Sequence, residues 1–97
     1  MIRVLYVEDN EDNIYMLSRR LRKKSFDVLI AQDGQAGVEL ALNELPDIIL
    51  MDLSLPIKDG WQAIEEIKGN AQVQHIPIIA LSAHAMDQHR LDALEAG

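Results

Sequence analysis

The chain has 97 residues, 48% of them hydrophobic, no cysteine and a formal net charge of −7. This length predicts one domain with one core, and the lack of cysteine excludes disulfides, thiolate metal sites and a cysteine nucleophile. The acidic balance and few aromatic residues argue against direct binding of nucleic acid, and no apolar run is long enough to span a membrane, so we expect a cytoplasmic protein.

Short apolar runs alternate with segments of helical periodicity along the whole chain. The runs predict strands at 2–7, 28–31, 48–53 and 76–82, and the periodic segments predict helices at 13–24, 33–46, 61–70 and 86–97. Strands that alternate with helices at this spacing indicate βαβ units. The pattern therefore predicts an α/β domain with a parallel sheet that is covered on both faces.

Basic residues are concentrated in one stretch, because five of the nine Lys and Arg lie within 19–24. This stretch falls at the end of the first predicted helix, where cations complement the helix dipole. We therefore interpret it as a solvated helix face and end, in preference to a phosphate-binding patch.

Polar side chains follow three of the predicted strands. Glu8 and Asp9 follow the first, Asp52 closes the apolar part of the third, and Ser82 follows the fourth. Ligands of open parallel sheets bind at the carboxyl ends of the strands, and Mg²⁺ prefers oxygen ligands. Each acidic residue alone is commonly a helix cap or turn residue, but the three together predict a Mg²⁺ site.

Asp52 has a second potential role, because a carboxylate can attack phosphorus and form an aspartyl phosphate. The metal would neutralise part of the phosphoryl charge, and the Ser82 hydroxyl would donate a hydrogen bond to a phosphoryl oxygen. Considered without the acidic residues, Ser82 would be interpreted as part of the cap of the next helix.

Three segments together resemble the receiver domains of two-component response regulators, the group that includes the chemotaxis receiver. The segments are "VEDN" at the first strand exit, "DIILMDLSLPIKDG" around the third strand and "IPIIALSAHAM" at the fourth. They match the family's pattern in order and spacing, and the resemblance covers 1–97. It implies a flavodoxin-like, doubly wound sheet with strand order 2-1-3-4-5, in which the first and third strands are neighbours.

The resemblance also implies roles for individual residues. Asp52 would be the phosphoacceptor, Asp9 a direct Mg²⁺ ligand, Glu8 a ligand acting partly through water, and the Ser54 backbone carbonyl the third protein ligand. Ser82 would be the switch hydroxyl.

Two further positions follow Ser82. By the resemblance, Ala83 would be the small residue that leaves room for the switch hydroxyl. His84 lies where receivers can overhang the phosphoryl site, so it would tune hydrolysis or touch a partner; the alternative is an ordinary surface histidine.

The implied partners are a histidine kinase or histidine phosphotransfer protein, which donates the phosphoryl group, and a downstream protein target. Slow self-catalysed hydrolysis would follow, so we do not expect an enzyme with turnover. The alternative function is that of a receiver-like interaction module that is not phosphorylated. Neither a second aspartate two residues after Asp52, as in aspartate-nucleophile phosphatases, nor a glycine-rich nucleotide-binding loop is present.

The sequence differs from the pattern of the receiver family at its C-terminus. Receivers normally continue into a fifth strand, a phosphoryl-contacting lysine and a fifth helix, whereas this sequence stops at Gly97. We therefore expect a C-terminally incomplete receiver domain that self-associates through an uncovered sheet edge. Lys58 is the only lysine close in sequence to Asp52, and we interpret it as an exposed turn residue.

Overall fold

A computed structural model describes residues 1–55 and 57–81 of the chain. Strands and helices alternate along this part, as the sequence predicts. In chain order they are β1 (Arg3–Val7), α1 (Glu11–Lys23), β2 (Asp27–Ala31), α2 (Gly34–Glu44), β3 (Ile48–Asp52), α3 (Gly60–Lys68) and β4 (Ile78–Leu81). The predicted helix at 86–97 lies outside the described residues.

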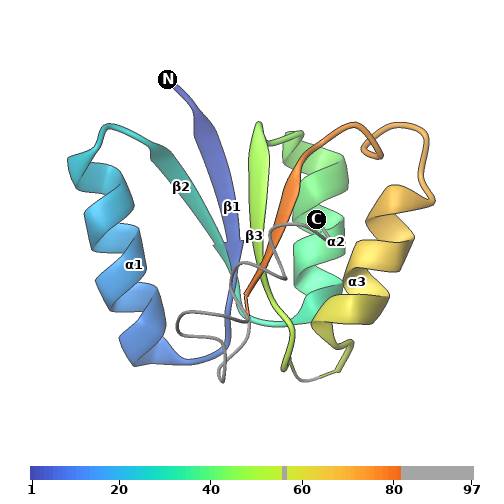
Figure 1. Cartoon of the computed structure of the whole chain (residues 1–97), viewed down its shortest axis with the longest axis horizontal. Helices are drawn as coiled ribbons and strands as arrows, with labels where there is room; N and C mark the ends of the chain where they lie inside the picture. Colours follow the sequence, from blue (N-terminus) through green and yellow to red (C-terminus); the bar gives the residue numbers. More distant parts are fainter. Residues whose placement is uncertain (56, 82–97) are drawn as a thin grey trace.

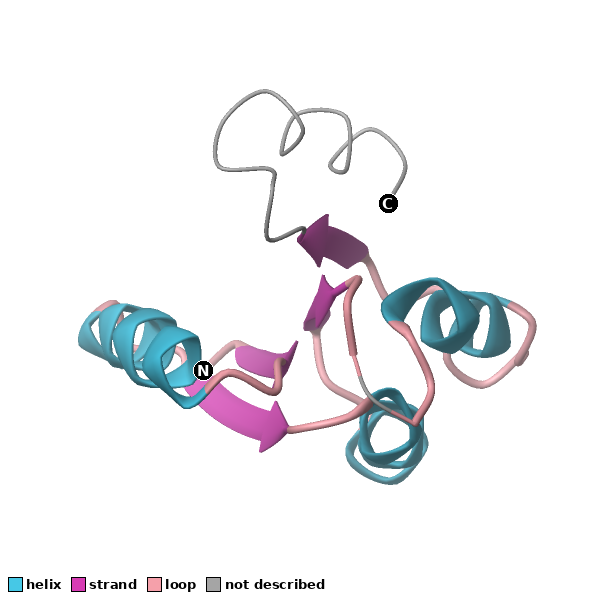
Figure 2. Ribbon diagram, turned by 90° about the horizontal axis from the view of Figure 1, so that it is seen from below, coloured by secondary structure: helices cyan, strands magenta, loops and turns pink. Residues whose placement is uncertain are grey.

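All neighbouring strands of the described sheet are parallel, and their order is β2-β1-β3-β4. The predicted order 2-1-3-4 is thus confirmed for this part of the chain. Helix α1 covers one face of the sheet, and α2 and α3 cover the other (Figures 1 and 2). The fold is therefore a doubly wound α/β sheet, with every strand pointing toward the same edge.

The core lies between the sheet and the helices, and the two central strands contribute most to it. Leu5 and Val7 of β1, and Ile49 and Met51 of β3, are completely buried. Helix α3 adds Ile67 from its inward face. Val4–Val7 of β1 are all buried, so both faces of this strand are covered, which explains the nearly continuous apolar run at 2–7. In β3, Ile48 and Leu50 are only half-buried.

Each described helix begins at a side chain that caps it. Asn10 accepts a hydrogen bond from the Asn13 amide, Asp33 accepts one from the Ala36 amide, and Asp59 forms a reciprocal capping box with Gln62. These caps satisfy amide groups that have no partner within the helix. Because each cap follows a strand, the helices start at the carboxyl edge of the sheet.

Candidate functional site

Three carboxylates meet at the carboxyl edge of the two central strands. β1 pairs with β3 so that Val7 lies opposite Met51. Glu8 and Asp52, the next residues along, therefore lie at the same level of the sheet. The carboxyl ends of the strands point toward the lower side of Figure 1. Oxygens of Glu8, Asp9 and Asp52 all lie within 4.8 Å of one another. The structure thus brings together the three acidic residues that the sequence predicted to share this edge, because each lies at the end of a strand.

The three carboxylates differ in environment. Glu8 and Asp52 are each only 7% exposed, whereas Asp9 is exposed to solvent. Neither Glu8 nor Asp9 caps α1, because Asn10 does so. The interpretation of these two residues as helix caps is therefore wrong, whereas their alternative role as acidic partners of the helix dipole is not tested.

Both oxygens of Glu8 accept hydrogen bonds. Oε1 accepts one from the Tyr6 hydroxyl at 3.2 Å and one from Asn13 Nδ2 at 3.4 Å, and Oε2 accepts one from the Asn10 amide at 3.3 Å. Sequence reasoning missed Tyr6, which reads as one more apolar residue of the first strand. A tyrosine two residues before the acidic pair was the available signal, because alternate residues of a strand point to the same face.

The site is electrostatically unfavourable without a cation. Burial raises the pKa of Glu8, and the neighbouring Asp52 carboxyl raises it further. Burial and the adjacent Glu8 likewise raise the pKa of the Tyr6 hydroxyl, so this group stays a hydrogen-bond donor. Two buried acids and a third nearby repel one another unless a proton or a metal ion lies between them.

The connection from β3 to α3 packs tightly against the phosphoacceptor candidate. The Ser54 amide donates a hydrogen bond to Oδ1 of Asp52 at 3.2 Å. A Cβ atom on Gly60 would lie 2.2 Å from the Asp52 carbonyl oxygen and 2.6 Å from Leu53 Cα. The start of α3 can approach the end of β3 only because residue 60 lacks a side chain.

Two further residues shape this loop. Lys58 forms an ion pair with Glu66 of α3, and its side chain is only 21% exposed. Lys58 is a loop residue, as we interpreted it, but it is half-buried because its side chain pairs with the helix. Ile57 is 83% exposed and has a φ of 67°, a left-handed conformation that is unfavourable for a β-branched residue.

The roles of the other predicted site residues are not tested. Ser82, Ala83 and His84 lie outside the described residues, and their roles stay predictions. Ser54 is described, but its predicted contribution is a backbone carbonyl ligand, which also stays a prediction.

The donor set fits a hard divalent cation. Carboxylate oxygens from Glu8, Asp9 and Asp52 can converge on one point, and such ligands suit Mg²⁺. Asp9 is exposed to solvent, so water could complete the coordination of an ion held there. The cluster could therefore hold a divalent metal ion.

The described residues thus form a doubly wound parallel sheet with three carboxylates at its carboxyl edge that could hold a metal ion. The family model described as the response regulator receiver domain matches residues 4–97. The chain belongs to this family.

Curated relatives are similar to this chain in sequence. The chain is 34% identical over 95 residues to the response regulator PleD of Caulobacter vibrioides, covering 98% of this chain and 21% of PleD. It is 38% identical over 82 residues to the protein PilH of Pseudomonas aeruginosa, covering 84% of this chain and 68% of PilH. The chain thus spans about a fifth of PleD but most of PilH.

Solved structures agree with the fold. The receiver domain of the sensor histidine kinase PA1611 from Pseudomonas aeruginosa has a magnesium ion coordinated in its active site cleft. It superimposes with a TM-score of 0.85 at 38% identity, covering 99% of this chain and 79% of that one. The Mn²⁺-bound response regulator Rcp1 gives a TM-score of 0.80 at 27% identity, covering 99% and 75%.

In the described residues, no helix is both long and apolar enough to cross a membrane.

Proposed function

We propose that this chain is the phosphoacceptor of a two-component phosphorelay. A histidine kinase or a histidine phosphotransfer protein donates a phosphoryl group to Asp52, and the modified domain binds its downstream protein target differently. The observation that carries this proposal is the position of Asp52, a buried carboxylate at the end of a central strand with two other carboxylates within 4.8 Å. Membership of the receiver family supports the same role.

The transfer is a displacement at phosphorus. One Asp52 oxygen attacks the phosphorus atom, an O–P bond forms, and the P–N bond to the donor histidine breaks, leaving its electron pair on the imidazole nitrogen. The Ser54 amide holds Oδ1, so Oδ2 is the oxygen left to act as the nucleophile. Slow hydrolysis of the acyl phosphate then resets Asp52 without any enzyme turnover.

Asp9, Glu8, Asp52 and the backbone carbonyl of Ser54 would hold Mg²⁺ in this site. The bound ion would neutralise charge on the phosphoryl oxygens. Both oxygens of Glu8 already accept hydrogen bonds from the protein, whereas Asp9 is exposed. This difference supports Asp9 as a direct ligand and Glu8 as a ligand that acts partly through water.

The response to phosphorylation would involve residues beyond the described part. In this proposal, the Ser82 hydroxyl moves toward the phosphoryl group, Ala83 leaves it room, and His84 tunes hydrolysis. The protein would act in the cytoplasm, where the phosphodonor proteins are found, through protein partners and not by direct contact with nucleic acid.

Intact-protein mass measurement after incubation with acetyl phosphate tests the acceptor. With Mg²⁺, the chain should gain one phosphoryl group, and Asp52→Asn should gain none. Asp12→Asn is the matched control, because Asp12 is an exposed aspartate in the first turn of α1 and should leave labelling unchanged. Equal labelling of Asp52→Asn would contradict the acceptor assignment, and no labelling of the unmodified chain would favour a silent interaction module.

A further inference from the structure

The C-terminal half of α1 carries an unusual concentration of positive charge for so acidic a protein. Five of the nine Lys and Arg lie within 19–24, so the remaining chain has sixteen acidic residues against four cations. Among the described residues, the ion pairs involve Arg3 and Lys58, and none involves this cluster. The helix dipole explains a preference for cations in the last turn, but Arg19 lies before that turn.

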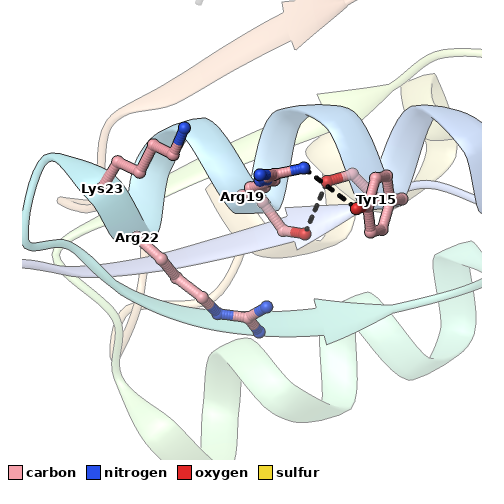
Figure 3. Close-up of a pocket in the computed structure, with 5 residues that line it drawn as sticks. Tyr15, Arg19, Arg22 and Lys23 are labelled. Atoms are coloured by element: carbon pink, nitrogen blue, oxygen red, sulfur yellow. Dashed lines mark hydrogen bonds between the residues drawn. The ribbon is translucent and has the colours of Figure 1, made fainter.

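Three of these cations line a shallow pocket of about 390 Å³ along α1, which we call the α1 basic pocket. Its lining residues are Tyr15, Ser18, Arg19, Arg22 and Lys23. Figure 3 shows Arg19 reaching back to Tyr15, while Arg22 and Lys23 extend from the next turn of the helix.

Tyr15 and Arg19 hold each other in place within this pocket. Arg19 Nη1 donates a hydrogen bond to the Tyr15 hydroxyl oxygen at 3.0 Å, and the guanidinium carbon lies 5.8 Å from the centre of the Tyr15 ring. This geometry is that of a cation–π contact. The pair is pre-organised, while the Tyr15 proton and the other guanidinium N–H groups stay available to an acceptor such as a carboxylate.

The surface is also apolar in part. Tyr15 lines the pocket and is 63% exposed, so its ring offers an apolar surface to a ligand. Exposed tyrosine and arginine side chains are among the types enriched in protein–protein interfaces. A ligand that matches this surface therefore needs carboxylates together with large apolar side chains.

Charge complementarity favours a short acidic protein segment over an extended polyanion. Salt screens charges beyond about 8 Å at physiological ionic strength, so a short segment is attracted mainly by the local cations. A DNA duplex or an anionic membrane extends over the rest of the surface, where acidic residues predominate.

The pocket is separate from the carboxylate cluster. Helix α1 leads into β2, whose first residue, Asp27, pairs with Arg3 at the amino end of β1. Glu8 follows the opposite end of β1, and a strand of this length spans on the order of 15 Å. A ligand in the α1 basic pocket would therefore leave the acceptor edge open (Figure 1).

We propose that the α1 basic pocket is a docking site for an acidic, amphipathic segment of a partner protein. Carboxylates of the segment bind Arg19, Arg22 and Lys23, and a large apolar side chain packs against Tyr15. This docking does not rest on the proposed function, because it involves none of the residues that would receive the phosphoryl group.

Fluorescence polarisation with a labelled synthetic peptide rich in Glu, Asp and Leu tests the site. Two double variants of equal charge change are compared on the full chain. Arg19→Gln/Arg22→Gln removes two pocket cations, whereas Arg20→Gln/Lys24→Gln removes two cations of the same helix end that do not line the pocket. The first should weaken binding about tenfold and the second by no more than about twofold.

Several outcomes would overturn the proposal. They are the absence of peptide binding to the unmodified chain, equal losses in the two double variants, and tighter binding of a DNA duplex or of phosphatidylserine vesicles than of the peptide. Self-association that is lost in the first variant alone would assign the pocket to a second copy of the chain and overturn it too. Circular dichroism melts verify folding, and unchanged labelling by acetyl phosphate in both variants separates this test from that of the acceptor.

Discussion

The hydroxyl of Tyr6 donates a hydrogen bond to Oε1 of Glu8 across 3.2 Å, and both side chains are buried. Tyr6 lies in the interior of β1, and Glu8 follows the strand on the same side, so a core residue reaches the acidic edge of the sheet. The hydroxyl fixes the orientation of a carboxylate that is otherwise repelled by Asp52. A buried strand residue therefore takes part in shaping the candidate metal site.

Replacement of Tyr6 by Phe removes this hydrogen bond and keeps the ring. We expect a several-fold weaker affinity for Mg²⁺, because outer hydrogen bonds orient metal-binding carboxylates. Isothermal titration calorimetry measures the affinity. Tyr15→Phe, at an exposed tyrosine of α1, is the control and should leave it unchanged. Unaltered Mg²⁺ affinity in Tyr6→Phe would show that Glu8 needs no support from the core.

Asp9 and Glu8 should differ in their effect on metal binding. Asp9→Ala removes an exposed, direct charged ligand, so we expect about a hundredfold loss of Mg²⁺ affinity. Glu8→Ala should cost about tenfold, because its oxygens are already engaged by protein donors. If Glu8→Ala loses more Mg²⁺ affinity than Asp9→Ala, then Glu8 is the direct ligand and Asp9 the one that acts partly through water.

The raised pKa of Glu8 predicts a pH dependence of stability in metal-free protein. The folded state keeps the Glu8 proton to a higher pH than the unfolded chain, whose pKa lies near the ordinary value of 4.5. The contribution of this group is therefore full below pH 4.5 and is lost as the pH rises through the higher pKa of the folded state.

Urea unfolding in EDTA at a series of pH values measures this loss. Glu8→Gln should lessen it, whereas Glu65→Gln, at an exposed glutamate of α3, should not. Added Mg²⁺ should restore stability to the unmodified chain at neutral pH. A wild-type profile that rises or stays flat across this window, or one that both variants change equally, would be inconsistent with a protonated Glu8.

Substitution of Gly60 tests the close packing behind Asp52. A Cβ atom there would clash with the backbone of Asp52 and Leu53, so Gly60→Ala should lower the free energy of unfolding by about 3 kcal/mol and reduce labelling of Asp52. Gly69→Ala is the matched control, because its nearest contact would be 3.1 Å and its φ is −85°. Its cost should stay below about 1 kcal/mol. Similar losses in both variants would argue against a special role for Gly60.

Ile57 offers a stabilising substitution in the same loop. Asn tolerates the left-handed conformation that Ile57 adopts at φ 67°, so Ile57→Asn should raise the free energy of unfolding by about 1 kcal/mol. Thermal melts would detect this. Ile2→Asn, at another exposed isoleucine, should give no such gain. A destabilised Ile57→Asn would mean that the exposed isoleucine makes favourable contacts.

The local features of this fold could be predicted from the sequence because they depend on neighbouring residues. Apolar runs and helical spacing predicted bounds close to the observed ones for every described strand and helix. Polar residues after the strands indicated where the helices begin. The strand exits also predicted which three carboxylates share an edge, since all parallel strands end on the same side. The chemical roles of these residues stay predictions.

Tertiary structure alone decided the contacts that depend on the distance between elements. Spacing could not show that β1 and β3 are neighbours, because the order of strands depends on how helices cross the sheet. It could not pair Lys58 with Glu66 either, since a side chain in a turn selects its partner only when a helix packs beside it. Likewise, the hydrogen bond from Tyr6 to Glu8 exists because the fold buries both groups together, where water cannot satisfy either.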